Sequence, residues 1–319
     1  MHRRQPLIIL TALCLLLAGG ARAQTAAPVA CPPAIKQLDD TEAAAAQAGA
    51  PNRGLMWRVS RDGRTSFLFG TLHVGKPEWL FPGPALREAF GATDTLALEL
   101  DVTDARVLQD LREAMAAMPA LALKPALRKR LEQQVSAACL PAQALAGLHP
   151  VMQVVTLTLL AARWEQLDAR YGQEMALAEQ ARAHGKAVVS LESARDQMQA
   201  LIPSDAAGGL AMLEDSLEQL ESNAVRPMLR RMARGWSEGD LADLQAFEAW
   251  CQCARTPAER AALKRLNDER NPAMATRFEA LHAQGKQVLV AVGALHMIGP
   301  LGLPRLLAQR GFQLERVTP

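Results

Sequence analysis

Several well-known catalytic and nucleotide-binding motifs are missing from this chain of 319 residues. It contains no His-Glu-x-x-His helix, no Gly-x-Ser-x-Gly elbow, no phosphate-binding P-loop and no Gly-x-Gly-x-x-Gly fingerprint. These absences argue against a zincin peptidase, a serine hydrolase of the α/β type, a P-loop enzyme and a dinucleotide-binding oxidoreductase. Any activity must therefore use a less familiar arrangement of residues.

Aromatic residues and excess positive charge are also scarce. Phe, Trp and Tyr make up only 4% of the chain, with a single Tyr, which argues mildly against a haem pocket. Removal of an N-terminal signal would take away three arginines. This would leave 32 of the 35 basic residues, compared with 33 acidic ones. The mature chain then carries a net charge near −1, and we expect no nucleic-acid partner.

Only one apolar run stands out, and it lies at the N-terminus. Arg3 and Arg4 precede an apolar stretch over residues 7–17, and Ala21-Arg22-Ala23 follows with small residues at the cleavage positions. This pattern predicts a signal peptide over residues 1–23 and a periplasmic or secreted protein. The run is too short to cross a bilayer, and no later segment is long and apolar enough, so we expect no transmembrane segment after cleavage. We expect a leader over residues 24–54 and a single folded domain over residues 55–319.

No Cys-x-x-Cys pair is present, and no cysteine adjoins a candidate histidine. Four cysteines follow the signal, which in an oxidising compartment predicts disulfides. A bridge between Cys251 and Cys253 would close a very small ring. We therefore expect long-range pairs, with Cys31 and Cys139 each joined to one of these two neighbours.

The most informative feature present is a short motif that occurs twice. Residues 67–73 read FLFGTLH and residues 289–296 read LVAVGALH, so each is an apolar strand followed by Gly-x-Leu-His. A buried strand brings the chain to a sheet edge, glycine permits a tight exit, and the edge presents His73 or His296. The remaining histidines of the mature chain, at positions 149, 184 and 282, lie in loops or polar helix ends and are expected to be solvated.

Two acidic residues also end expected strands. Glu99 follows an apolar segment over residues 95–98, and Glu192 follows another over residues 186–191. The rest of residues 104–285 reads mainly as helix. The pattern predicts an α/β fold, with a mixed central sheet built from both ends of the chain and a large helical insertion at about 104–285. Ligand sites in such sheets lie at the carboxyl ends of the strands, where all four side chains should meet.

These residue types suit a divalent metal. Two imidazoles and one carboxylate form a site with open positions for Zn²⁺, Mn²⁺ or Fe²⁺, and we assign His73, His296 and Glu99 as ligands. Glu192 is a further ligand or the general base, while Arg270 and Asn271 could hold a substrate carboxylate or a developing oxyanion. Structural roles remain open for three of them, because Glu99 and Glu192 could cap helices and Arg270 could be a surface residue.

The order of these motifs resembles the TraB/GumN family, which is related to the Tiki metalloproteases and, more remotely, to the erythromycin esterase and ChaN-like proteins. The resemblance rests on six segments spread over residues 55–317. They are residues 70–73 (GTLH), 98–101 (LELD), 186–193 (KAVVSLES, with Gln197 after it), 269–275 (ERNPAMA), 293–296 (GALH) and 302–312 (GLPRLLAQRGF). One departure is the sequence Gly172-Gln173-Glu174, where the family pattern has Gly-hydrophobic-Asp, so no role is carried over to this acid.

The resemblance implies a metal-dependent peptidase, with Mn²⁺ or Co²⁺ as the suggested ion. Our leading hypothesis is thus a secreted or periplasmic hydrolase that uses Mn²⁺, Co²⁺ or Zn²⁺ and acts on a peptide or protein substrate. Two alternatives remain open at this level. One is a non-catalytic envelope protein that binds haem or metal through the same histidines, and the other is an accessory protein of polysaccharide or envelope assembly.

Overall fold

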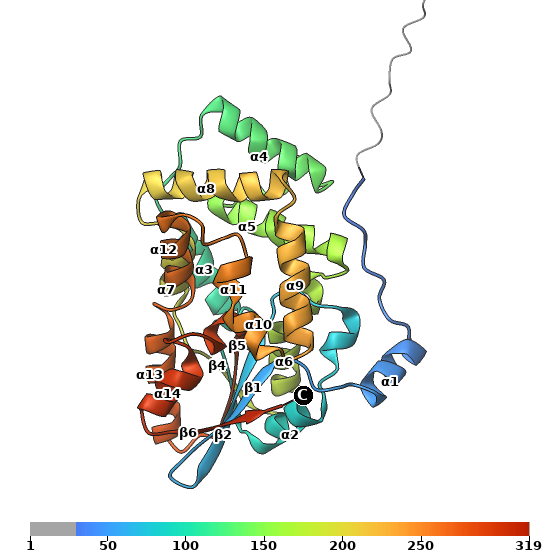
Figure 1. Ribbon diagram of the computed structural model, residues 1–319, viewed down its shortest axis with the longest axis vertical. Coiled ribbons are helices and arrows are strands. Elements are labelled where there is room, and N and C mark those ends of the chain that lie inside the picture. Colours follow the sequence, from blue (N-terminus) through green and yellow to red (C-terminus); the bar gives the residue numbers. More distant parts are fainter. Residues whose placement is uncertain (1–29, 319) are drawn as a thin grey trace, which may run out of the picture. The chain divides into compact units, whose positions relative to one another are not determined.

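The computed structural model describes residues 30–318, so the expected signal peptide lies outside the described residues. A single six-stranded sheet has the order β4-β3-β5-β2-β1-β6. Its strands are β1 (Leu55–Arg61), β2 (Arg64–Thr71), β3 (Thr95–Leu98), β4 (Ala187–Ser190), β5 (Val288–Gly293) and β6 (Gln313–Val317). The mixed α/β fold class predicted from the sequence is confirmed, with strands from both ends of the chain in one sheet (Figure 1).

The sheet combines a parallel and an antiparallel part. Strands β4, β3, β5 and β2 run parallel, so their carboxyl ends meet at one edge. Strand β1 pairs antiparallel with β2, and β6 pairs antiparallel with β1 at the outer edge. The turn between β1 and β2 is an Asp-Gly turn, in which Asp62 and Gly63 both have positive φ, at 52° and 72°. The central strand β5 is almost entirely buried, as expected for a parallel strand covered on both faces.

Helices cover both faces of the sheet. The segment 30–54 carries α1 (Asp40–Ala48), which begins with a capping box at Asp39. Apolar side chains of α2, α6 and α9 pack with Phe67, Phe69 and Leu289 on one face, and those of α13 and α14 pack with Leu68 and Val290 on the other. The bounds of these helices are α2 (Pro84–Ala92), α6 (Gln173–Ala183), α9 (Val225–Ser237), α13 (Asn271–Ala283) and α14 (Leu303–Gln309).

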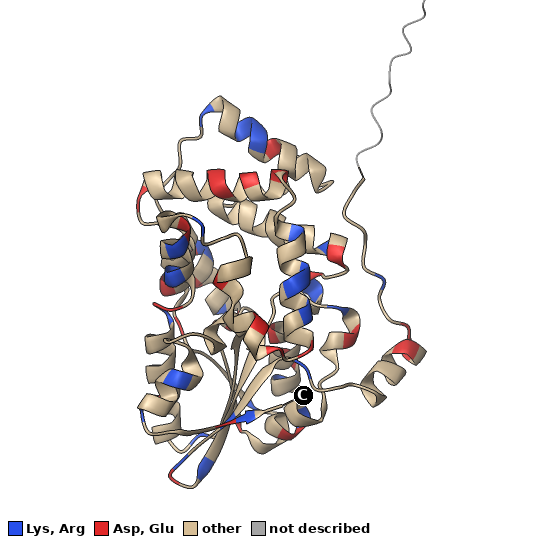
Figure 2. Cartoon of the chain, in the orientation of Figure 1, with Lys and Arg blue, Asp and Glu red and all other residues tan. Residues whose placement is uncertain are grey.

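The helical region between β3 and β5 has a core of its own. Leu131 of α4, Leu157 of α5 and Leu213 of α8 belong to one buried cluster away from the sheet. Figure 2 shows acidic residues along α8 and basic residues on α4, and Arg130 pairs with both carboxylate oxygens of Glu221 at 2.9 and 2.8 Å. The helices here are α3 (Ala105–Ala116), α4 (Pro125–Ala137), α5 (Pro150–Ala161), α7 (Ala194–Leu201), α8 (Ala206–Glu221), α10 (Leu241–Gln245), α11 (Phe247–Trp250) and α12 (Pro257–Leu266).

Short 3-10 helices occupy several connections, including the one after the second histidine motif. They are η1 (Pro77–Leu80), η2 (Ala162–Glu165), η3 (Ala169–Tyr171) and η4 (Ala294–Met297). None of the helices in residues 30–318 has the length and apolar character needed to cross a bilayer.

The disulfide pairing differs from the long-range pairing that the sequence predicts. Cys31 pairs with Cys139, and Cys251 pairs with Cys253. The small ring is possible because Gln252 adopts a left-handed backbone with φ of 56°, which turns the chain and leaves the two Cα atoms 5.1 Å apart. The sequence argument wrongly treated the short separation as a barrier.

The two bridges predict very different effects on stability. Replacing Cys31 and Cys139 with serine opens a loop of 108 residues and should lower the free energy of unfolding by about 2–4 kcal/mol. The same change at Cys251 and Cys253 opens a ring between cysteines separated by 2 positions in the sequence. It should lower the free energy of unfolding by less than about 2 kcal/mol. Urea denaturation of both double variants measures this, and equal losses would contradict the assignment.

Candidate active site

Four side chains follow the carboxyl ends of the four parallel strands. Glu192 comes after β4, Glu99 after β3, His296 after β5 and His73 after β2. Because the strand order is β4-β3-β5-β2, the two histidine motifs lie on neighbouring strands although they are 223 positions apart in the chain. The edge predicted from the sequence therefore brings these residues to one side of the sheet.

The two motif glycines lie in close packing. Gly293 donates its backbone N–H to Glu99 Oε1 at 2.8 Å, and a Cβ atom at this position would lie 3.2 Å from the same oxygen. A Cβ atom on Gly70 would lie 3.1 Å from Ala294 Cα on the neighbouring motif. Neither glycine has a positive φ. Glycine at these positions therefore favours close approach of the neighbouring groups rather than an unusual turn.

Arg270 connects two buried carboxylates. It precedes α13 and donates from Nε to Glu192 Oε1 at 2.9 Å and from Nη2 to Glu99 Oε2 at 2.5 Å. Its Nη1 donates to the carbonyl of Leu266 at 2.9 Å. The side chains of Glu99 and Glu192 are only 8% and 3% exposed, so water compensates their charges poorly. Arg270 is therefore part of the site and not the surface residue of the alternative reading.

His296 is held in one orientation by Asn271. The Nδ2 group of Asn271 donates to the carbonyl of Leu301 at 2.9 Å, which directs its Oδ1 atom toward His296 Nδ1 at 2.7 Å. The proton of the ring must then be on Nδ1, because an amide oxygen only accepts hydrogen bonds. The Nε2 lone pair is left facing Glu99 Oε1 at 3.5 Å and Arg270 Nη1 at 3.3 Å.

His73 has a partner that the sequence analysis did not assign. Its Nδ1 atom lies 3.0 Å from Glu174 Oε1, and the same oxygen accepts a hydrogen bond from Thr71 Oγ1 at 2.6 Å. Glu174 belongs to the first turn of α6, and a Cβ atom on Gly172 would lie 2.9 Å from the carbonyl oxygen of His73. The departure Gly172-Gln173-Glu174 was the available signal, because an acid in the same place can still reach His73.

The two histidines differ in protonation. Burial lowers the pKa of His296 to about 4, so this ring is neutral at pH 7. The charge of Glu174 raises the pKa of His73 to about 9, although the side chain is 61% exposed. One imidazole is thus a neutral buried donor and the other an exposed cation paired with a carboxylate.

The carboxylates of Glu99 and Glu192 have pKa values shifted in opposite directions. Burial raises the pKa of Glu99, but His296, Arg270 and His73 outweigh burial and bring its pKa far below the ordinary range. Burial raises the pKa of Glu192, and the opposing effect of Arg270 does not fully cancel this. For Arg270, burial favours the neutral form, yet the two glutamates leave its pKa above the ordinary value. Glu192 is therefore the carboxylate closest to accepting a proton.

The donor atoms of the site fit a divalent cation by their chemistry. Both imidazoles bond through Nδ1 to a neighbouring side chain, which leaves Nε2 for coordination, the arrangement usual for metal-bound histidine. Glu99 adds a carboxylate beside them. Within residues 30–318, however, no group of three or more His, Cys, Asp or Glu side chains is placed to hold a metal ion, and Arg270 lies against Glu99 and His296.

Two of the remaining histidines are not solvated as expected. His282 is 1% exposed and lies between the rings of Phe278 and Phe312, because its helix α13 packs on the sheet. His149 caps α5 through Nδ1, which accepts a hydrogen bond from Val151 N, and its Nε2 contacts the carbonyl of Pro119 at 3.0 Å. Of the histidines at positions 149, 184 and 282, only His184 is exposed. None of the three lies at the strand edge.

Comparison with known proteins gives a consistent result. A sequence model described as the TraB/PrgY/gumN family matches residues 55–316. An uncharacterised protein named YbaP from Shigella flexneri is 27% identical over 254 residues, which cover 76% of this chain and 88% of that protein. YbaP from Escherichia coli K12 is 27% identical over 250 residues, covering 75% and 86%. No solved structure matches the chain.

Proposed function

The chain belongs to the TraB/PrgY/gumN family, and we propose on this premise that it is a metal-dependent hydrolase of peptide or amide bonds. The observation that carries the proposal is the matched anchoring of the two motif histidines. His73 is held through Nδ1 by Glu174, and His296 is held through Nδ1 by Asn271. The signal-peptide pattern of residues 1–23 supports a periplasmic or secreted location.

The proposed ligands are His73 Nε2, His296 Nε2 and the carboxylate of Glu99. A divalent ion such as Mn²⁺, Co²⁺ or Zn²⁺ supplies an acidified water and polarises the substrate carbonyl when bound. Asn271 and Glu174 orient the imidazoles and are positioning residues, since both ends of the Asn271 amide are already engaged. Arg270 neutralises Glu99 and Glu192 and keeps both at the edge.

Glu192 is the general base of this proposal. Burial holds its pKa above the ordinary value, which makes this carboxylate a better proton acceptor than an exposed glutamate. Its carboxylate takes the proton of the attacking water and returns it to the leaving amine. Arg270 remains charged throughout, because its pKa is raised by the same two carboxylates.

Metal analysis joined to a cleavage assay tests the proposal. The purified protein is loaded in parallel with Mn²⁺, Co²⁺ and Zn²⁺, and each sample is assayed on a peptide library and for bound metal. His73→Ala and His296→Ala should each lose bound metal, whereas His184→Ala, a change at an exposed helix end, should not. If neither site variant binds less metal, the shared site is wrong. Bound metal without cleavage under any of the three ions would favour a binding protein instead.

The pH dependence of metal affinity follows from His73. With a pKa of about 9 this imidazole is protonated at neutral pH, and the proton must leave before Nε2 can coordinate. Metal affinity should therefore rise by about tenfold per pH unit from pH 7 toward pH 9. His296, with a pKa of about 4, adds no slope in this range.

Glu174→Gln provides the matched variant for this slope. Without the carboxylate the His73 pKa should return toward its ordinary 6.5, so metal affinity should become nearly independent of pH above 7. Calorimetric titrations with Zn²⁺ at several pH values measure both slopes. A flat profile for the unchanged protein would remove His73 from the ligand set.

A further inference from the structure

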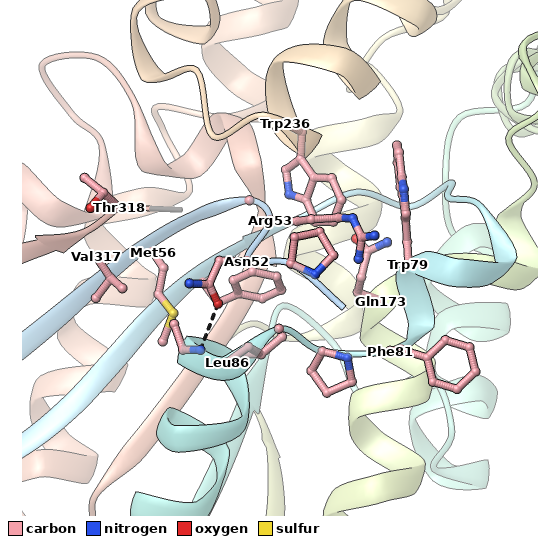
Figure 3. Close-up of a pocket in the computed structure, with 16 residues that line it drawn as sticks. Asn52, Arg53, Met56, Trp79, Phe81, Leu86, Gln173, Trp236, Val317 and Thr318 are labelled. Carbon is pink, nitrogen blue, oxygen red and sulfur yellow. Dashed lines mark hydrogen bonds between the residues drawn. The ribbon is translucent and has the colours of Figure 1, made fainter. Parts of the chain in front are cut away.

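A second concave site lies over the sheet face beside β2. Its walls include Trp79 of η1, Trp236 of α9 and Phe81, and Arg53 and Gln173 also line it. Figure 3 shows Arg53 beside the two tryptophan rings, whose centroids lie 5.0 Å apart. None of the residues assigned to the metal site lines this pocket. It therefore needs an explanation of its own.

The chain segment that carries Arg53 is held rigidly. Gly54 donates its N–H to the carbonyl of Trp236 at 2.9 Å, and a Cβ atom on Gly54 would lie 2.8 Å from Phe69. On the other side, Asn52 Oδ1 accepts the backbone N–H of Ala85 at 2.8 Å (Figure 3). The arginine thus extends from a fixed backbone, which lowers the entropy lost when it binds a ligand.

Several side chains of the pocket have hydrogen-bond donors that are not used within the described residues. Arg53 makes no hydrogen bond or ion pair within residues 30–318, although burial disfavours its charge and only Glu78 acts on it from a distance. The Nδ2 group of Asn52 and the indole Nε1–H of Trp79 also lack acceptors among the described residues. Donors without acceptors, one of them a guanidinium, favour an anion with planar oxygen geometry.

The space beside Arg53 limits the size of that anion. The cavity volume is about 30 Å³, enough for one or two water-sized groups such as the oxygens of a carboxylate. A second cavity of about 260 Å³ shares Trp79 and Gln173 with the first, and Leu80 and Leu177 are among the residues that line it. We infer that the pair of cavities binds a carboxylate with an apolar group next to it, as at the C-terminal residue of a peptide.

The pocket adjoins the proposed active site through two side chains. Gln173 Oε1 accepts the backbone N–H of Leu72 at 2.8 Å, one residue before His73. Trp236 donates from Nε1 to the carbonyl of Gly70 at 2.6 Å. A substrate anchored here would lie beside the first histidine motif. This last step rests on the proposed function, whereas carboxylate binding itself does not.

Binding of two small probes tests the inference. N-acetyl-leucine carries the carboxylate and the apolar group, and N-acetyl-leucinamide is its neutral counterpart. Calorimetry on the full chain should detect the acid, with the amide bound at least about tenfold more weakly. Arg53→Gln should weaken binding of the acid by about tenfold or more, because a charged hydrogen bond is lost. Trp79→Phe, which removes the indole donor and part of the ring but keeps an aromatic side chain, should cause a smaller loss.

Arg128→Gln is the matched control, since this exposed arginine of α4 has no side-chain partner among residues 30–318. It also removes one arginine charge, but at a residue that does not line the pocket, and it should leave the affinity for N-acetyl-leucine unchanged. Equal binding of acid and amide, no binding of either, or no effect of Arg53→Gln would overturn the inference. If the acid binds as expected but no peptide is cleaved with any ion, the proposed function fails while the carboxylate site stands.

Discussion

Replacing Arg270 with methionine is expected to lower the free energy of unfolding by about 3–5 kcal/mol, the largest loss that we expect from one substitution. Methionine has a similar length but cannot donate a hydrogen bond. The change leaves Glu99 and Glu192 unpaired, with side chains that are 8% and 3% exposed. Urea denaturation at neutral pH measures the difference.

A nearby arginine supplies the control for this experiment. Arg265 donates from Nε to the carbonyl of Ala200 at 2.9 Å and forms no ion pair within residues 30–318. Arg265→Met should therefore cost only about 1 kcal/mol, the usual value for one neutral acceptor. Comparable losses for both variants would show that the two carboxylates do not depend on Arg270.

The pH dependence of the Arg270→Met loss has a definite sign. In the unchanged protein the pKa of Glu99 is lowered, so its contribution to stability is present above the ordinary value of 4.5 and is lost as pH falls. In the variant the unpaired carboxylates should have raised pKa values and become neutral on mild acidification. The stability difference between the two proteins should consequently begin to shrink at a pH above 4.5, where the variant's carboxylates take up protons, and should continue to shrink as pH falls further.

His73→Ala is expected to leave the fold intact and to reduce peptide hydrolysis by more than about 100-fold, because loss of a proposed metal ligand should exceed the roughly 10–100-fold effect usual for loss of a group that only orients one. The side chain is 61% exposed and contributes no core packing, so stability should change little. Initial rates with each activating ion, together with thermal unfolding, give both quantities.

Glu174→Gln separates positioning from chemistry at this histidine. Unlike His73→Ala, this variant keeps the histidine. It removes only the carboxylate that lies 3.0 Å from His73 Nδ1. Loss of such an anchoring group should reduce metal affinity or activity by about 10–100-fold, less than loss of the histidine itself. Full activity in His73→Ala, with metal bound as before, would remove this residue from the mechanism.

The strand edge could be predicted from the sequence, but the partners within it could not. Buried parallel strands can be recognised as short apolar runs, and their carboxyl ends share one edge of the sheet. The position of His73, Glu99, Glu192 and His296 at this edge could therefore be predicted from local patterns. The role of Arg270 in joining two carboxylates depends on how α13 packs, because the residue lies in the turn before that helix. No local pattern contains that information.

The errors have similar physical causes. Glu174 was passed over because it occupies the place of a shorter acid, and only the position of α6 shows that it reaches His73. His282 lies in a polar sequence but on the buried face of its helix. The bridge between Cys251 and Cys253 depends on the left-handed backbone of Gln252, a conformation that the sequence does not predict.

The position of β5 has a consequence for the order in which the protein is synthesised. This strand comes from residues 288–293, yet it lies between β2 and β3, which pair with it and not with each other. While the chain is still on the ribosome, β2 and β3 each have an open edge until more than nine-tenths of the chain has been made. The two histidine motifs therefore cannot meet before translation is almost complete, and a chain that stops earlier exposes unpaired strand edges, which are prone to aggregation.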